Sequence, residues 1–261
     1  MGSRFDITIV SQDEATADHY IDKAIEEITR IENLISSWNP SSQTSKINNN
    51  AGVNPVKVDQ ELIDLIERCI TVSKITDGAF DITYASIDKV WKYDGSMTEM
   101  PTKEAIENSV AKIGYQNIVL DKKSQTVFLK LEGMKIGFGA IGKGYAADKV
   151  RGMLKAEGVK SGIINASGDL TTWGKQPDGT DWMVGITNPL NKDNIFSWFP
   201  VVNAAVATSG NYEKYVTFNG IKYSHIIDPR TGYPSTGILS VTIFAPSAEL
   251  CDALATSVFI T

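Results

Sequence analysis

The segment GFGAIGKGYAAD, residues 137 to 148, has the residue types of a phosphate-binding loop. Its first three glycines satisfy the dinucleotide pattern GxGxxG, and Gly142 with Lys143 comes within one residue of a P-loop. Glycines let the backbone approach phosphate oxygens, and the amide groups at the start of a following helix attract their negative charge. The segment therefore predicts either a ligand that carries phosphate groups or a tight strand-to-helix turn without a ligand.

Neither standard phosphate motif fits this segment. A Rossmann loop requires an acidic residue at a strand end about 20 residues further on, and the nearest fit, Asp169, comes later than that. A P-loop requires Ser or Thr directly after Lys143, where Gly144 stands. Because four glycines exceed what a simple turn needs, a phosphate-cradling loop of neither standard kind is the best interpretation.

Asp252 and Thr256 lie four residues apart in the predicted last helix, SAELCDALATS, and so share one helical face. A carboxylate and a hydroxyl on one face make half of a magnesium site, because Mg²⁺ takes oxygen ligands and fills the rest of its shell with water or phosphate. The plain alternative is an acid in the first turn beside a solvated threonine. A net charge of −6 favours the metal, since an acidic protein that binds phosphate must supply local positive charge.

His225 lies near the end of the predicted strand KYSHIID, directly before the turn DPRTGYP. Catalytic side chains are often displayed at such positions, and an unperturbed imidazole can act as a general base near neutral pH. The alternative is a structural histidine that anchors the turn.

The composition of the chain argues against several classes of protein. The chain has 261 residues, of which 42% are hydrophobic, and no run of Lys and Arg interleaves with aromatic residues as a nucleic-acid surface would. Its two cysteines, Cys69 and Cys251, fall in apolar helical patterns and are expected to be buried. MGSRFDITIV predicts a strand, with neither the charged segment nor the apolar run of a signal peptide or membrane span.

The hydrophobic patterns predict a mixed α+β fold with antiparallel strands and packed helices. We expect one domain over residues 1–261, with room for a short further element after Thr261. A polar, turn-rich loop is expected over 37–55. Gly78 is expected to cap the C-terminal end of the helix at 59–78 that follows this loop. The remaining predicted elements are strands at 5–10, 161–167, 182–188, 196–210, 214–228 and 239–246, a strand pair with a turn at 121–124, and helices at 11–36, 59–78, 145–159 and 247–260.

Seven motifs, in order, resemble the ApbE family of FAD:protein FMN transferases over nearly the whole chain: MGSRF, TDGAFDIT, GFGAIGKGYAADK, NASGDL, ATSGNYE, SHIIDPRTGYPS and CDALATS. The resemblance implies a magnesium-dependent transferase that uses FAD as substrate. Such an enzyme attaches FMN through a phosphoester to a Thr or Ser hydroxyl of an acceptor flavoprotein, of the redox-pump or flavin-reductase type, and releases AMP. This covalent flavinylation is a post-translational modification.

The same resemblance implies roles for individual residues. The metal would be held by the carbonyl of Ala140 and the side chains of Asp252 and Thr256, and His225 would deprotonate the acceptor hydroxyl. Trp38 stands where the family often places a residue that stacks on the flavin. Six further positions match family positions near the flavin nucleotide: Met1, Ala79, Phe80, Asp81, Lys143 and Ile226.

Two residues depart from the family pattern: Gly137 stands where an acid is common, and Ser167 replaces one of two adjacent glycines. Family members in Gram-negative bacteria are usually exported lipoproteins, so we expect a periplasmic or otherwise extracytoplasmic protein, with a membrane link only through a removed lipid anchor. This sequence has no lipobox cysteine, and a cytoplasmic location is the alternative. The rival functions are an FAD pyrophosphatase that uses water as acceptor and a non-catalytic FAD-binding module.

Overall fold

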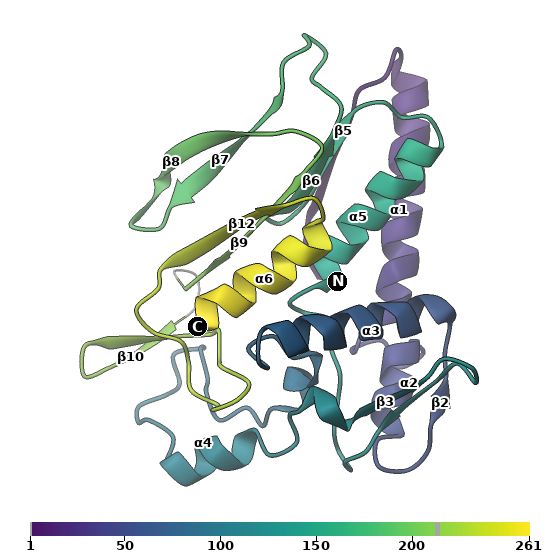
Figure 1. Cartoon of the computed structure of the whole chain (residues 1–261). Helices are drawn as coiled ribbons and strands as arrows, with labels where there is room; N and C mark the ends of the chain where they lie inside the picture. Colours follow the sequence, from purple (N-terminus) through teal and green to yellow (C-terminus); the bar gives the residue numbers. More distant parts are fainter. Residues whose placement is uncertain (1, 212–214) are drawn as a thin grey trace. The chain divides into compact units, whose positions relative to one another are not determined.

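A computed structural model describes residues 2–211 and 215–261 (Figure 1). Met1, one of the predicted nucleotide contacts, lies outside the described residues. The chain divides into two compact units, and the expectation of one domain stays a prediction. Unit 1 comprises Met1–Glu32, Ala140–Gly210 and Ser240–Ala255, and unit 2 comprises Asn33–Gly139, Asn211–Leu239 and Thr256–Thr261. Helices and antiparallel sheets occur in this chain as predicted, which confirms the α+β fold class.

A five-stranded antiparallel sheet forms the centre of unit 1. Its order is β1-β5-β6-β9-β12, so sequence-distant strands lie side by side. These strands span Phe5–Ile9, Gly162–Ala166, Asp169–Trp173, Ala205–Gly210 and Ser240–Ala245. A separate hairpin pairs β7 (Trp182–Asn188) with β8 (Asn191–Val201).

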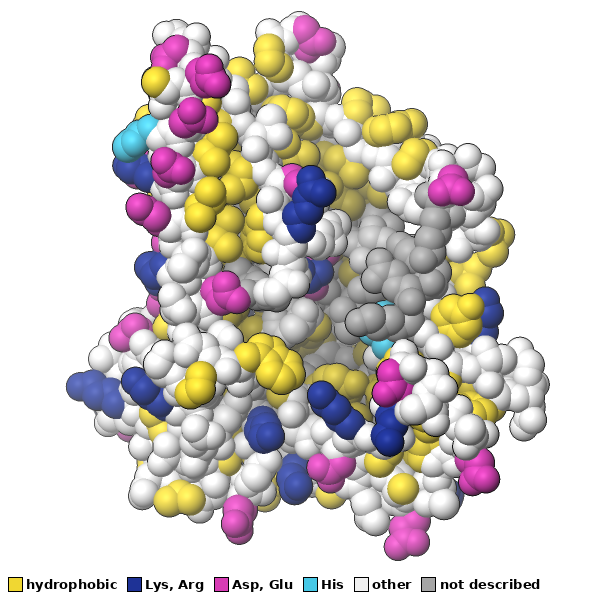
Figure 2. Space-filling model, turned by 180° about the vertical axis from the view of Figure 1, so that it is seen from behind, with side chains coloured by type: hydrophobic (Ala, Val, Ile, Leu, Met, Phe, Trp, Pro, Cys, Tyr) yellow, Lys and Arg dark blue, Asp and Glu magenta, His cyan; other side chains and the backbone are white. Residues whose placement is uncertain are grey.

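Three helices pack on the sheet of unit 1: α1 (Glu14–Ile35), α5 (Gly142–Ala156) and α6 (Ala248–Ile260). Their shared core is rich in alanine, which allows helices and strands to approach closely. Acidic side chains gather along the exposed side of α1 (Figure 2). The buried core residues are Ala24, Ala147, Val150, Leu154, Val159, Ile164, Trp173, Ala205, Ala207, Ala248, Cys251 and Ala255.

Unit 2 combines short helices with two small antiparallel sheets. One sheet has the order β2-β4-β3 (Val56–Lys57, Thr126–Leu129, Ile118–Asp121), and the other pairs β10 (Tyr215–Phe218) with β11 (Ile221–Ser224). Its helices are α2 (Gln43–Asn49), α3 (Gln60–Ile75), η1 (Ile82–Ser86), α4 (Lys103–Ser109) and η2 (Tyr115–Asn117). Across the described residues, no helix has both the length and the apolar character that crossing a bilayer requires.

Several local predictions were wrong. The segments 196–210 and 214–228, each predicted as one strand, are divided between β8 and β9 and between β10 and β11. The predicted loop over 37–55 contains helix α2, which begins because the hydroxyl of Ser42 accepts a hydrogen bond from the Ser45 N–H at 2.9 Å. After α3, Asp77 and not Gly78 takes the first left-handed position, with φ of 49°. Gly78 follows with φ of 76° and donates its N–H to the Ser73 carbonyl, which is the hydrogen bond of a Schellman motif.

Ser167 and Gly168 form the two-residue turn between β5 and β6, with φ of 54° and 101°. A turn with two positive φ values is the preferred short hairpin connection, and glycine adopts it at the lowest cost. Ser167 takes this conformation while its hydroxyl donates to the Arg4 carbonyl at 2.9 Å. The turn delivers Asp169 as the first residue of β6.

The start of α5 packs directly against the start of α6. A Cβ added to Gly144 would lie 2.1 Å from the carbonyl oxygen of Ala248, a distance that no side chain can occupy. Glycine is therefore required at position 144 for packing between helices, whatever ligand the loop binds. The predicted helix at 145–159 begins earlier than expected, at Gly142, so this contact lies inside its first turn.

We predict that Gly144→Ala lowers the free energy of unfolding by about 1 to 3 kcal/mol or more, because the methyl group forces α5 and α6 apart. Gly152→Ala on the same helix is the matched control, since a Cβ there meets no described atom within 4 Å. Replacing a mid-helix glycine by alanine should stabilise the protein by about 0.5 to 1 kcal/mol. Urea denaturation of both variants measures the difference, and equal effects would contradict the packing role of Gly144.

Candidate functional site

The first turn of α5 takes a capping group from another helix. The N-cap position is occupied by Ile141, whose side chain has no hydrogen-bonding atom. The Gly144 N–H instead donates to Oδ2 of Asp252 on α6, at 3.3 Å. A carboxylate is favourable here because the start of a helix carries partial positive charge. The glycine loop and the predicted metal ligand Asp252 therefore meet within unit 1.

A second buried carboxylate joins this contact. Asp169 is 3% exposed and Asp252 is 5% exposed. Asp169 forms an ion pair with Lys143, in the first turn of α5. The two acids also interact with each other, so two carboxylates and one ammonium group gather at the start of α5. The structure thus brings the predicted residues Lys143 and Asp252 together and adds Asp169.

Burial dominates the electrostatics of both acids. Burial raises the pKa of Asp252, and the neighbouring charge of Asp169 raises this pKa further. Burial also raises the pKa of Asp169, while the ammonium group of Lys143 acts in the opposite direction. With both carboxylates ionised, the cluster would carry more negative charge than the one ammonium group of Lys143 balances. A bound cation would compensate that charge.

The donor set at this point fits a magnesium ion. Carboxylate, carbonyl and hydroxyl oxygens are the ligands that Mg²⁺ prefers. The described residues contain no group of three or more His, Cys, Asp or Glu side chains suited to a metal ion. Remaining ligands would therefore come from the backbone, from hydroxyl groups and from the substrate. Ala140 lies in the turn before α5, and Thr256 follows Asp252 by one turn of α6, so both stay predicted ligands.

Sequence reasoning missed the part that Asp169 plays. It considered this acid only as the partner of a Rossmann loop, for which the spacing was too long. The signal that could have identified it is its position directly after the turn Ser167–Gly168, since a two-residue turn displays the next side chain at a fixed place on the strand.

The second half of the motif TDGAFD, residues 79–81, is buried in unit 2. Ala79 and Phe80 are 0% and 2% exposed, so a ligand could reach them only after the residues that cover them move. The Asp81 carboxylate accepts hydrogen bonds from Thr83 N–H at 2.8 Å, Thr83 Oγ1 at 2.7 Å and Tyr115 N–H at 2.8 Å. Asp81 thereby caps η1 and ties it to η2. The predicted contacts of these residues with the flavin nucleotide stay predictions.

Trp38 is the most exposed large hydrophobic residue in the described part of the chain, at 84%. The ammonium group of Lys89 lies 5.9 Å from the centre of its ring. An exposed indole that contributes little to the core is available for stacking on a planar ligand. This position suits the predicted contact with the flavin ring, which stays a prediction.

His225 follows β11 and lies next to an aromatic side chain of unit 2. Its ring centre is 6.5 Å from that of Tyr93, with the two planes at 83°. The Tyr93 hydroxyl donates to the Ser224 carbonyl at 2.7 Å. Ile226, the predicted nucleotide contact beside His225, donates its N–H to the Ser224 hydroxyl and accepts from the Ser235 N–H at 2.9 Å. These contacts hold the backbone on both sides of His225.

The turn DPRTG after His225 is held by its own side chains and by one indole. Asp228 accepts from the Arg230 N–H, Nε and one terminal nitrogen, each at 2.9 Å. Trp91 Nε1 donates to the Gly232 carbonyl at 3.0 Å. The turn also meets the motif TDGAFD, because a Cβ on Gly78 would lie 3.6 Å from Cγ of Arg230. Two motifs that are about 150 residues apart therefore lie side by side in unit 2.

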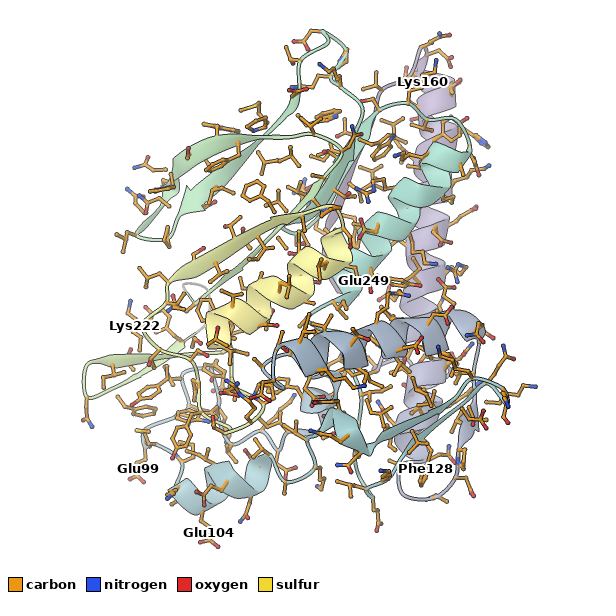
Figure 3. The ribbon with its side chains drawn as sticks, viewed as in Figure 1. Glu99, Glu104, Phe128, Lys160, Lys222 and Glu249 are labelled. Atoms are coloured by element: carbon orange, nitrogen blue, oxygen red, sulfur yellow. The ribbon has the colours of Figure 1, made fainter. Side chains whose placement is uncertain are left out.

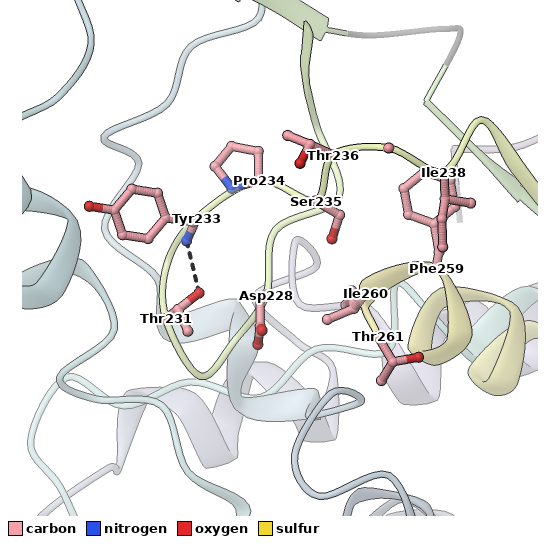
Figure 4. A pocket seen from close by; sticks show the side chains of 11 residues that line it. Asp228, Thr231, Tyr233, Pro234, Ser235, Thr236, Ile238, Phe259, Ile260 and Thr261 are labelled. Carbon is pink, nitrogen blue, oxygen red and sulfur yellow. Dashed lines mark hydrogen bonds between the residues drawn. The ribbon is translucent and has the colours of Figure 1, made fainter. Parts of the chain in front are cut away.

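A cavity of about 360 Å³ opens beside the same turn (Figure 4). One wall carries hydroxyl groups and another is apolar. Among the described residues, no predicted site residue lines it, so the cavity is not counted as the flavin site. Its lining residues are Asp228, Thr231, Tyr233, Pro234, Ser235, Thr236, Gly237, Ile238, Phe259, Ile260 and Thr261.

Gly137 occupies a crowded position, which bears on the departure noted in the sequence. Its N–H donates to the Ile82 carbonyl at 2.9 Å, and an added Cβ would lie 3.0 Å from the Cβ of Ala85. Any side chain at this position would require η1 to shift. Within this chain the absence of an acid at position 137 therefore matches the local packing.

Fold and site together define an α+β protein that gathers buried carboxylates and a lysine at a glycine-rich helix start. The profile of the ApbE family matches residues 1–261, and the chain belongs to this family. An FAD:protein FMN transferase of Klebsiella pneumoniae (strain 342) is 32% identical over 99% of this chain and 79% of its own length.

Solved structures of the same family share the fold. The ApbE protein of Thermotoga maritima is 33% identical with a TM-score of 0.88, over 99% of this chain and 84% of that one. The apo form of the flavinyl transferase ApbE of Pseudomonas stutzeri is 26% identical with a TM-score of 0.87, over 100% of this chain and 82% of that one.

We predict that Asp252→Asn stabilises the metal-free protein, and more so as the pH rises. Burial raises the pKa of Asp252 on folding, so deprotonating Asp252 in the folded protein lowers the free energy of unfolding. This loss is absent below about pH 4 and grows as the pH rises towards the raised pKa. The asparagine oxygen can still accept from the Gly144 N–H. At pH 7.5 the gain should be on the order of 2 kcal/mol.

Denaturation of wild type and Asp252→Asn at pH 5 and pH 7.5, in chelator, measures this effect. A gap between the two proteins that does not widen with pH would contradict it. Added Mg²⁺ should raise the Tm of the wild type and leave the variant nearly unchanged, which separates the metal site from general stabilisation.

Proposed function

We propose that this chain is an FAD:protein FMN transferase that uses magnesium. The observation that carries the proposal is the pair of buried acids, Asp169 and Asp252, at the glycine-rich start of α5, in a family whose curated relatives bear that name. Helix starts with exposed amide groups favour phosphate, and buried acids favour a divalent cation. A pyrophosphate substrate with Mg²⁺ presents both kinds of charge.

In the proposed reaction one bond forms and one breaks at the phosphorus of the FMN half of FAD. The acceptor hydroxyl oxygen bonds to this phosphorus, the pyrophosphate P–O bond breaks, and AMP leaves with the bridging oxygen. When bound, Mg²⁺ neutralises charge that develops on the phosphates. Asp252, the Ala140 carbonyl and Thr256 would hold it, with Asp169 adding negative charge beside Asp252.

The proton of the acceptor hydroxyl goes to His225 in this proposal. A neutral imidazole can accept a proton from a hydroxyl group that it contacts. The contacts of the neighbouring residues Ser224 and Ile226 support this role, because they hold the backbone of His225 in place. Lys143 would offset phosphate charge, and Trp38 would stack on the flavin ring.

An FAD pyrophosphatase is the second candidate function, since water can replace the acceptor hydroxyl in the same displacement. The exposure of Trp38 favours neither function. Incubation of the protein with FAD and Mg²⁺ tests the proposal through the release of AMP. AMP together with FMN bound to an added acceptor flavoprotein supports the transferase. AMP with free FMN only would support the pyrophosphatase. If no AMP is released, a non-catalytic FAD-binding module is the remaining interpretation.

The location and partner of the protein remain proposals from the family resemblance. We propose an extracytoplasmic enzyme whose acceptor is a flavoprotein of a redox pump or flavin reductase.

We predict that His225→Ala lowers the single-turnover rate of FMN transfer by about 10² to 10⁴-fold, the usual range for positioned proton transfer. FAD affinity and Tm should stay near the wild-type values. Tyr93→Phe is the matched control, because it removes the hydrogen bond to the Ser224 carbonyl and keeps the ring beside His225. It should lower Tm and reduce transfer far less than His225→Ala does, because the imidazole is still present. A destabilised His225→Ala variant with normal transfer per bound FAD would refute the general-base role.

A further inference from the structure

Helices α5 and α6 exchange carboxylate caps at their first turns. Asp252 of α6 accepts from the Gly144 N–H of α5 at 3.3 Å, and Asp148 of α5 accepts from the Glu249 N–H of α6 at 2.9 Å. Glu249 marks the start of α6 in Figure 3. Gly144 and Asp148 are one helical turn apart, as are Ala248 and Asp252. The close approach of Gly144 to Ala248 lies between the two caps.

Asp148 is itself held in place by an arginine. Arg151 lies one turn further along α5, and its terminal nitrogen is 3.2 Å from Oδ1 of Asp148. The same nitrogen donates to the Pro246 carbonyl at 3.1 Å, directly before α6. Asp148 and Arg151 are only 17% and 18% exposed, so solvent weakens these contacts little. The pair connects α5 to both the entry and the first turn of α6.

This connection bears on Asp252 because Glu249 precedes it by three residues, less than one turn of a rigid helix. A displacement of the first turn of α6 therefore moves the Asp252 carboxylate by a comparable distance. Mg²⁺ demands near-ideal ligand geometry, and residues that orient its ligands affect its affinity strongly.

We propose that Asp148 is a positioning residue that sets the place of the Asp252 carboxylate for cation binding. The inference rests on the proposed function in one respect, the role of Asp252 as a metal ligand. Asp148 does not touch the cation in this proposal. It acts through the Glu249 N–H and through Arg151.

Binding of Mn²⁺ alone, measured by electron paramagnetic resonance of the free ion, tests the proposal without any turnover. Asp148→Ala should weaken Mn²⁺ binding by about 10 to 100-fold, the range for residues that orient metal ligands. Asp148→Asn should weaken Mn²⁺ binding less than Asp148→Ala, because the amide oxygen can still accept from the Glu249 N–H although the ion pair with Arg151 is lost. The same order should appear in the Mg²⁺ concentration that half-saturates FAD turnover, with kcat largely recovered at high Mg²⁺.

Asp13→Ala is the matched control. Asp13 caps α1 in the same unit, where its carboxylate accepts from the Thr16 N–H at 2.8 Å. It should lower Tm as Asp148→Ala does and leave Mn²⁺ affinity unchanged. Wild-type Mn²⁺ affinity in Asp148→Ala would overturn the positioning role and leave the proposed function intact. A wild-type protein that binds no Mn²⁺ would overturn the metal assignment and this inference together.

Discussion

The contact between the first turns of α5 and α6 is the constraint on which the candidate site depends. Backbone meets backbone at Gly144 and Ala248, so the helices approach more closely than any side chain at position 144 would allow. The approach places the amide groups of one helix start within reach of a carboxylate on the other. Two groups that every helix leaves unpaired at its start are thereby satisfied from a neighbour. The same contact that stabilises the helices also determines where Asp252 lies.

Packing stabilises this contact, whereas the burial of carboxylates beside it costs free energy. Two nearly buried carboxylates, Asp169 and Asp252, lie beside one lysine, and burial raises the pKa of both. Uncompensated buried charge costs folding free energy, and functional sites are where proteins retain such an arrangement. A cation or phosphate-bearing ligand would complete the charge balance that the protein alone leaves unfinished. At Asp252, the same buried charge that would attract a cation therefore lowers the stability of the metal-free protein.

The motif residues of unit 2 have structural roles in the described chain. Asp81 uses its carboxylate to cap η1 and to hold η2, while Ala79 and Phe80 lie in the interior. Trp38 is the opposite case, because nearly all of its ring faces solvent. The residues that the sequence assigns to the flavin site of unit 2 therefore include buried ones that support the local structure and one exposed residue that is available to a ligand.

The sequence by itself determined the fold class, most of the strands and long helices, and the family, and it pointed to the glycine segment and Asp252 as candidates for the site. These follow from local spacing, because periodicity and turn residues act over a few neighbours. Tertiary structure alone decided that Gly144 serves helix packing, that Asp169 stands beside Asp252 and Lys143, and that TDGAFD meets DPRTG. It also decided that residues 43–49 form a helix, since buried contacts support a polar segment whose pattern predicts a loop. Such features depend on residues that are distant in the chain, and spacing along one sequence carries no information on which distant backbones come into contact.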